Sequence, residues 1–335
     1  MRRILSIDGG GIRGVFPAAF LAGLEDELEQ PIGRYFDLIC GTSTGGIIAI
    51  ALAMGVSAKE VLALYEEKGP EIFDQDQDGV IGWFKRRCRD GRWALWGPKY
   101  ETDALEAAIR SVLGERKLGE AQTRLMIPAW NAATRKVYVY KTAHHERLTT
   151  DYKDPAVDAA LATSAAPTFF REHITANDVG LVDGGLWANN PAGNAVVEAV
   201  GVLGWPAAEI KLLSISCLED VMKAKRAYSA RSMVKKTAAF FQAGQSFGSM
   251  GVAHLLLGDP HTRQAIWRIC QPVPEGFFNL DNTRRIRDLK ERGFIEAREK
   301  KPILKTHFFT EPAAPFVPAH ALEARGDDPC QHKTV

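Results

Sequence analysis

Residues 36–54 read Phe36-Asp-Leu-Ile-Cys-Gly-Thr-Ser-Thr-Gly-Gly-Ile-Ile-Ala-Ile-Ala-Leu-Ala-Met54, so that a single serine stands between two apolar segments. The segment before Ser43 predicts a buried strand, and the segment after it predicts a helix. Gly41 and Gly45 leave room for a sharp turn between the two, because a side chain there would meet the strand or the helix. The stretch therefore predicts an α/β fold with an exposed serine hydroxyl at a strand-to-helix turn, the usual place of an acyl-transfer nucleophile.

A second strand-to-helix junction lies near the start of the chain. Residues 3–7 predict a strand and residues 15–29 predict an amphipathic helix. The connection between them, residues 8–14, reads Asp-Gly-Gly-Gly-Ile-Arg-Gly. Backbone amides of such a loop, at the positive end of a helix, suit either a bound anion or a developing oxyanion.

The same glycines also match a dinucleotide-binding fingerprint, Gly9-x-Gly11-x-x-Gly14. That motif requires an acidic residue at the end of the second strand, whereas Asp37 lies at the start of that strand. With Ser43 in the very next turn, the oxyanion hole is the favoured interpretation.

A carboxylate follows a later apolar run. Residues 180–185 read Gly-Leu-Val-Asp-Gly-Gly, and Asn189-Asn-Pro191 comes shortly after. Gly184 and Gly185 leave space for Asp183 to approach a distant nucleophile, although a structural Asp in a turn is the alternative. None of the eight histidines has a strand-end setting beside glycines. A Ser-Asp dyad, in which the carboxylate itself accepts the serine proton, is therefore the alternative to a Ser-His-Asp triad.

Composition narrows the class of protein. With 335 residues and 46% hydrophobic content, the chain can bury a large core. The start shows no apolar stretch typical of a signal peptide, and the longest apolar run, residues 45–56, is too short to cross a bilayer. The five cysteines have no metal-binding or disulfide spacing. These features favour a cytoplasmic protein without a metal or other cofactor.

Charge is unevenly distributed. Residues 221–310 hold 17 Lys and Arg against 7 Asp and Glu, although the whole chain has a net charge of only +1. This surplus favours an anionic partner such as a phosphate group or an acidic membrane surface; the alternative is a solvated helical face.

Two further segments, residues 74–79 and 83–96, resemble functional patterns but allow other interpretations. Residues 74–79 imitate the opening of a calcium-binding loop, but Lys85 occupies the twelfth position, where a bidentate Glu is needed. Residues 83–96 interleave Trp and Phe with Lys and Arg. This pattern suits either a membrane-contacting lid or an ordinary surface insertion.

Four motifs together resemble the patatin-like phospholipase family over about residues 4–217. They are Asp8-Gly-Gly-Gly-Ile-Arg-Gly14, Gly41-Thr-Ser-Thr-Gly45, Ser164-Ala-Ala-Pro-Thr168, and Asp183-Gly-Gly185 with Asn189-Asn-Pro191. The resemblance implies that Ser43 is the nucleophile and Asp183 its general base. It further implies an oxyanion hole made by the amides of Gly10 and Gly11 with Arg13 in support. The remaining motif glycines are Gly9, Gly14, Gly41, Gly45, Gly184 and Gly185.

Residues 242–269, with Gly244-Gln245 and His254-Leu-Leu-Leu-Gly258, are similar to bacterial patatin-like effectors of antiphage (CBASS) signalling. Such effectors degrade membrane phospholipid when a cyclic di- or trinucleotide binds. This resemblance implies a nucleotide second messenger as activator, at residues that it does not identify, and a peripheral position at the inner face of the membrane. It gives no role to a nucleic acid polymer and is compatible with a homo-oligomer. An ungated lipid acyl hydrolase, and a non-catalytic binding module on the same fold, are the alternatives.

The expected architecture is a three-layer α/β sandwich with a mainly parallel sheet. Residues 1–220 are expected to form the catalytic domain, with the site at the carboxyl ends of the strands. Residues 221–310 are expected to be a basic helical extension packed on that domain. Residues 311–335, rich in proline, are expected to be an extended or disordered tail.

Overall fold

The computed structural model describes residues 1–73, 97–221, 230–258 and 264–323. Two expectations, the calcium-like loop at 74–79 and the aromatic and basic segment at 83–96, lie outside these residues.

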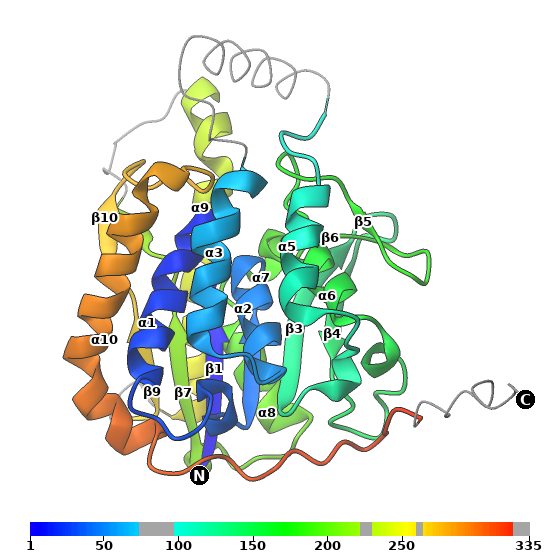
Figure 1. Ribbon diagram of the computed structural model, residues 1–335, viewed down its shortest axis with the longest axis vertical. Helices are drawn as coiled ribbons and strands as arrows, with labels where there is room; N and C mark the ends of the chain where they lie inside the picture. Colours follow the sequence, from blue (N-terminus) through cyan, green and yellow to red (C-terminus); the bar gives the residue numbers. More distant parts are fainter. Residues whose placement is uncertain (74–96, 222–229, 259–263, 324–335) are drawn as a thin grey trace, which may run out of the picture.

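A mixed sheet of eight strands forms the centre of the molecule (Figure 1). Five neighbouring strands are parallel, which confirms the expected α/β fold. They are, in spatial order, β3 (Arg124–Asn131), β2 (Leu38–Gly41), β1 (Arg2–Ile7), β7 (Ile210–Ile215) and β9 (Ile266–Ile269). Antiparallel strands extend the sheet beyond β3, namely β4 (Lys136–Lys141), β6 (Gly180–Asp183) and β5 (His173–Ile174).

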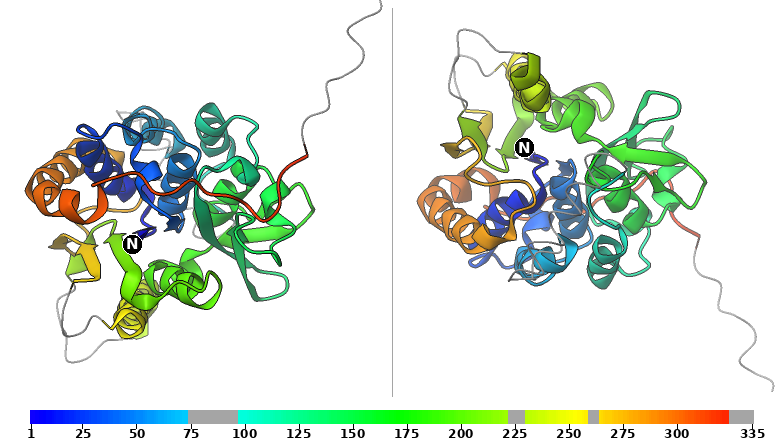
Figure 2. Two further views of the ribbon diagram at one scale, coloured as in Figure 1. Left: turned by 90° about the horizontal axis from the view of Figure 1, so that it is seen from below. Right: turned by 90° about the horizontal axis from the view of Figure 1, so that it is seen from above.

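Helices cover both faces of the sheet (Figures 1 and 2). One face carries α1 (Val15–Glu25), α2 (Thr44–Ala53), α3 (Ala58–Ile72), α5 (Asp103–Leu113), α6 (Ala156–Ser164) and α10 (Ile286–Phe308). The other face carries α7 (Gly185–Ala188), α8 (Ala192–Gly201) and α9 (Ala230–Leu257). The architecture is thus the expected three-layer sandwich.

The side chains of β1 show why both faces are covered. Leu5 and Ile7 belong to the large core under α1, α2 and α10, whereas Ile4 belongs to the second core under α8 and α9. Successive side chains of a strand point to opposite faces, so a strand that is apolar throughout needs a helical layer on each side. The continuous apolar run of β1 therefore places it at the centre of the sheet.

Residues 221–310 differ from the expected set of helices. They also contribute β9, which adds an edge strand to the main sheet, and β10 (Pro272–Pro274), which pairs with β8 (Glu219–Val221). Since β9 pairs with β7, which pairs with β1, this part of the chain lies one strand away from the strand that leads into the glycine loop. The C-terminal region is therefore built into the sheet as well as packed on it.

The described part of the proline-rich tail is extended and crosses the end of the sheet opposite the glycine loop (Figure 1, red). The guanidinium of Arg3 donates to the carbonyls of Phe308 and Glu311 at 2.8 and 2.6 Å. Ala319 N donates to the carbonyl of Ala143 at 2.7 Å. These bonds tie the tail to β1 and to the loop after β4.

Among the described residues, the helices are too short or too polar to span a bilayer.

Candidate active site

Ser43 lies at the turn between β2 and α2, as the sequence predicts. Its backbone φ is 55°, a positive value that residues other than glycine rarely adopt. A Cβ on Gly41 would come within 2.0 Å of the carbonyl oxygen of Gly45, and a Cβ on Gly45 within 2.4 Å of the carbonyl oxygen of Ile7. The turn is thus possible only with glycine on both sides of the serine, and it leaves Ser43 partly exposed at the start of a helix.

Hydrogen bonds from other elements fix this turn. The amide of Ser43 donates to Oγ1 of Thr163 at 3.0 Å, and that hydroxyl donates to the carbonyl of Pro128 on β3 at 2.6 Å. Thr42 donates to the carbonyl of Ala188 at 2.6 Å. Thr163, at the end of α6, thus positions the serine, and no sequence pattern singled it out.

Asp183 is the last residue of β6 and is 5% exposed. Because β6 is antiparallel to β3, Asp183 lies opposite Ala129 within β3. It thus comes from an antiparallel strand, whereas Ser43 and the glycine loop follow the carboxyl ends of parallel strands.

The carboxylate of Asp183 accepts a hydrogen bond from the amide of Gly185 at 2.6 Å. Burial raises the pKa of Asp183 to about 6, although the nearby side chain of Ser43 and the amide of Gly185 oppose this shift. The structure thus brings together two side chains 140 residues apart in sequence and makes the carboxylate a stronger base than an exposed Asp.

The glycine loop, residues 9–11, passes beside Ser43. A Cβ on Gly9 would lie 3.2 Å from Cβ of Ser43. The amides of Gly9 and Ile12 donate to the carbonyls of Asn189 and Leu280 at 2.9 and 2.8 Å.

No hydrogen bond occupies the amides of Gly10 and Gly11 within the described residues, and both glycines are partly exposed. Two free backbone donors next to the serine are what an oxyanion hole requires.

Asn189 connects the loop to the carboxylate. Its Oδ1 would lie 2.5 Å from a Cβ on Gly9 and 3.2 Å from a Cβ on Gly185. The adjacent Asn190 donates from Nδ2 to Ser246 of α9 at 3.0 Å, and its amide donates to Oε1 of Gln245 at 2.9 Å. The Asn-Asn-Pro segment therefore lies between the site and α9.

Arg13 has a different surrounding from the one expected. Its guanidinium donates to Asp220 at 2.8 Å and to the carbonyl of Phe278. Both partners follow β7 in the chain, and neither belongs to the Ser43 turn. Arg13 therefore anchors the glycine loop to these segments.

Three histidines have carboxylate or lysine partners elsewhere. His144 contacts Glu198, His173 contacts Asp158 and His307 contacts Lys211. In each case the contact that the ring makes is with a residue other than Ser43.

A family model described as patatin-like phospholipase matches residues 5–196. A cGAMP-activated phospholipase of Vibrio cholerae is 40% identical over 200 residues, which are 57% of this chain and 55% of the relative. One of Pseudomonas aeruginosa is 39% identical over 193 residues, covering 56% of this chain and 54% of the relative. Patatin-like protein 2 of Arabidopsis thaliana is 36% identical over 217 residues, covering 58% and 52%. The chain thus spans about half the length of these relatives.

Among solved structures, VipD of Legionella pneumophila aligns with 92% of this chain and 67% of its own, with a TM-score of 0.46 and 12% identity.

Proposed function

The chain belongs to the patatin-like phospholipase family, and we propose that it is a serine hydrolase that cleaves the acyl esters of glycerophospholipids with Ser43 and Asp183. One observation carries this proposal: a serine on a strained strand-to-helix turn lies next to a buried carboxylate of raised pKa, beside two free backbone amides. These are the nucleophile, the base and the oxyanion donors that acyl transfer requires.

In the first half of the reaction, the carboxylate of Asp183 accepts the proton of Ser43 as its Oγ attacks the ester carbonyl carbon. The amides of Gly10 and Gly11 stabilise the resulting oxyanion. When the tetrahedral intermediate collapses, Asp183 returns the proton to the departing lysophospholipid oxygen. An acyl-enzyme on Ser43 remains.

In the second half, Asp183 takes a proton from water, whose oxygen attacks the acyl-enzyme. Collapse of the second intermediate returns the proton to Ser43 and releases the fatty acid. Because Asp183 has a pKa of about 6, it is largely ionised at neutral pH and still basic enough to take part.

We further propose that a cyclic nucleotide gates this activity in antiphage defence. Bacterial relatives about 40% identical to this chain are named cGAMP-activated phospholipases. In this chain, residues 220, 278 and 280 contact the loop that carries the oxyanion amides. A ligand that binds the basic C-terminal region, residues 221–310, would therefore reach the site through contacts that already exist.

Contact with the membrane is proposed for α9. Residues 237–258 contain no Asp, Glu, Lys or Arg. Phe241, Phe247 and Leu255 are 72, 85 and 76% exposed. Large exposed apolar side chains on an uncharged helical segment suit the boundary between headgroups and acyl chains. We therefore place the working protein at the surface of the bilayer that holds its substrate.

Release of free fatty acid from vesicles of phosphatidylethanolamine and phosphatidylglycerol tests the function. Wild type and Ser43→Ala would each be assayed alone and with cGAMP, c-di-GMP, c-di-AMP or a cyclic trinucleotide. Activity of the wild type with one nucleotide only supports the gated phospholipase. Activity without a nucleotide supports an ungated lipid acyl hydrolase. Silence in every arm, on soluble esters as well as vesicles, overturns the hydrolase and favours a non-catalytic module.

A further inference from the structure

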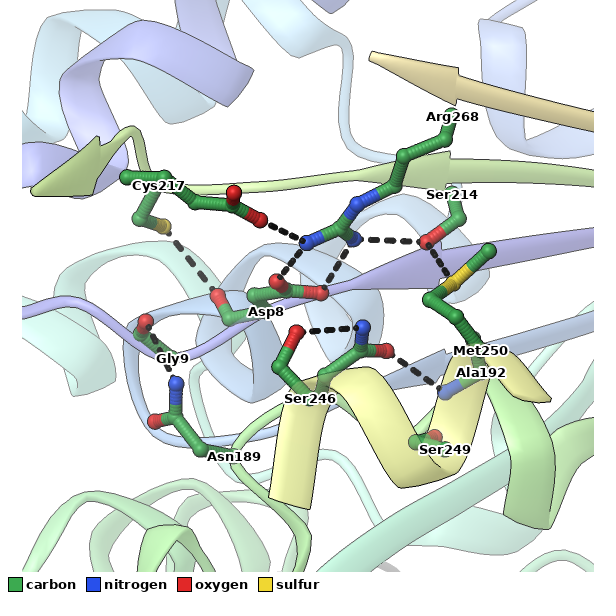
Figure 3. A network of polar contacts seen from close by, with 12 residues as sticks. Asp8, Gly9, Asn189, Ala192, Ser214, Cys217, Ser246, Ser249, Met250 and Arg268 are labelled. Atoms are coloured by element: carbon green, nitrogen blue, oxygen red, sulfur yellow. Dashed lines mark hydrogen bonds and ion pairs between the residues drawn. The ribbon is translucent and has the colours of Figure 1, made fainter. Parts of the chain in front are cut away.

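An ion pair joins the start of the glycine loop to β9. Arg268 Nη1 and Nη2 approach Oδ1 and Oδ2 of Asp8 at 2.9 and 2.6 Å (Figure 3). The side chains are 17 and 6% exposed. Arg268 also donates to Oγ of Ser214 at 2.8 Å and to Glu219 at 3.3 Å. The guanidinium therefore holds both carboxylate oxygens at once and is itself oriented from two further sides.

Asp8 has little freedom to move under this clamp. Its amide donates to the carbonyl of Ile215 at 3.0 Å, and its carbonyl accepts from the thiol of Cys217 at 3.1 Å. Burial raises the pKa of the Asp8 carboxyl, and Arg268 opposes that shift. Without Arg268, the buried carboxylate would have to take up a proton or move towards water.

A displacement of Asp8 would carry the loop with it. Gly10 follows two residues later and packs against Cys217, whose Cβ would lie 2.3 Å from a Cβ on Gly10. The two free amides are thus held by the backbone of Asp8 on one side and by the end of β7 on the other. Hydrogen bonds to a developing oxyanion lose much of their benefit when the donor shifts by about 1 Å.

We propose that Arg268 is a positioning residue for the reaction: its two-point pairing with Asp8 sets the amides of Gly10 and Gly11 where the oxyanion forms. The inference rests on the proposed serine-hydrolase function. Arg268 acts through Asp8 and contacts neither the substrate nor Ser43. It lies outside residues 5–196, which the family model matches, so the rate of the chemical step depends on the C-terminal part of this chain.

The test compares Arg268→Lys and Arg268→Met with wild type on a soluble aryl ester. Arg287→Met is the matched control, because the Arg287 side chain is 88% exposed and pairs with Glu291 on its own helix. Lys keeps the charge but cannot span two carboxylate oxygens. We expect kcat to fall roughly 10-fold in Arg268→Lys and roughly 100-fold in Arg268→Met, with KM within about twofold of wild type. The control should match wild type.

A second readout separates positioning from loss of folded protein. A trifluoromethyl ketone analogue adds to the active serine and forms an oxyanion, so its Ki should rise in parallel with the fall in kcat/KM. Misfolding would lower the concentration of active enzyme and leave Ki unchanged. A reduced kcat with an unchanged Ki overturns the proposal, as does a kcat of wild-type size in Arg268→Met.

The double variant Asp8→Asn/Arg268→Met removes both charges and keeps the proposal testable if Arg268→Met unfolds. Its melting temperature should exceed that of Arg268→Met, because no unpaired buried charge remains, while its kcat stays low. Recovery of kcat together with stability would show a purely structural role. Wild type that hydrolyses no ester overturns the proposed function itself, whereas active wild type with unaffected Arg268 variants overturns only this inference.

Discussion

The turn that carries Ser43 and the glycine loop beside it are held in different ways. The described contacts of the turn come from residues 7–188, all within the part that the family model matches. The loop is held mainly by Ile215, Cys217, Asp220, Arg268 and Leu280, which lie beyond that part. The turn is therefore supported by the matched part of the chain alone. The glycine loop, which we propose carries the oxyanion donors, depends in addition on residues beyond that part.

Among changes to the turn and the loop, Ser43→Ala in the turn should have the largest effect on activity. Loss of the proposed nucleophile should lower ester hydrolysis by roughly 10⁴-fold or more, while the thermal midpoint stays close to that of wild type. Ser111→Ala is the control, since Ser111 is exposed on α5 and bonds to its own helix. A folded Ser43→Ala enzyme with full activity would contradict the assigned nucleophile.

Asp183→Asn removes the proposed base and should lower kcat roughly 10³- to 10⁴-fold. Asp178→Asn is the matched control, because Asp178 is exposed and has φ of 59°, a conformation that Asn adopts as readily as Asp. Steady-state kinetics on a soluble ester measure both. Equal activity of the two variants would remove Asp183 from the mechanism.

Gly11→Ala tests the loop's dependence on the C-terminal part. Gly11 has φ of 56°, and a Cβ there would meet the carbonyl oxygen of Leu280 at 2.3 Å. Gly114 has φ of 58° with open space around it, so Gly114→Ala also places a side chain at a positive φ but without the clash. Both should lose about 1 kcal/mol of stability from the strain, and only Gly11→Ala should lose kcat, by roughly 10- to 100-fold. Similar kcat values for the two variants would show that activity does not depend on the contact between the loop and Leu280.

The pH dependence of kcat/KM tests the role of Asp183 directly. The base works as a carboxylate, and burial raises the pKa of Asp183 to about 6 from an ordinary 3.8. Activity should therefore rise with pH: kcat/KM for a neutral ester should increase about tenfold per unit below pH 6 and level off above it. An inflection near pH 4 would show that Asp183 is not desolvated in the working enzyme.

Asp220→Asn should have the smallest effect. The change weakens the pair with Arg13 but leaves the carbonyl of Phe278 as a second anchor. The Asp220 side chain is 30% exposed, so the pair should contribute less than about 1 kcal/mol and kcat should fall less than about fivefold. Asp288→Asn, on the exposed side of α10, is the control. A loss as large as that of Gly11→Ala would identify Asp220 as a main support of the loop.

The Ser43 turn and the glycine loop could be predicted from the sequence, because short local patterns specify both. An apolar run, small residues and a second apolar run specify the Ser43 turn within twenty residues. The glycine loop and the run before Asp183 are equally short patterns. The prediction that Ser43 and Asp183 lie close together rested on the family resemblance, because no local pattern specifies a contact between residues 140 positions apart.

The contacts that hold the turn and the loop in place could not be predicted from local sequence patterns. Thr163 is an ordinary helix residue until α6 brings it to the amide of Ser43. Strand β9 has only four residues, and residues 221–310 were expected to be helical. One signal could have helped: Arg268 interrupts the apolar run Ile266-Trp-Arg-Ile-Cys270, and a charge in a buried strand requires a partner.

The span of the Asp8–Arg268 pair also orders events during synthesis. The two residues are 260 positions apart, and Arg3 on β1, the strand that precedes Asp8, bonds to Phe308, 305 positions further along the chain. A growing chain therefore displays Ser43 and Asp183 long before β7 and β9 can pair beside β1. Such distant pairing folds slowly and leaves strand edges open meanwhile. We expect the nascent hydrolase to stay inactive on the ribosome and to require protection from aggregation until its last strand emerges.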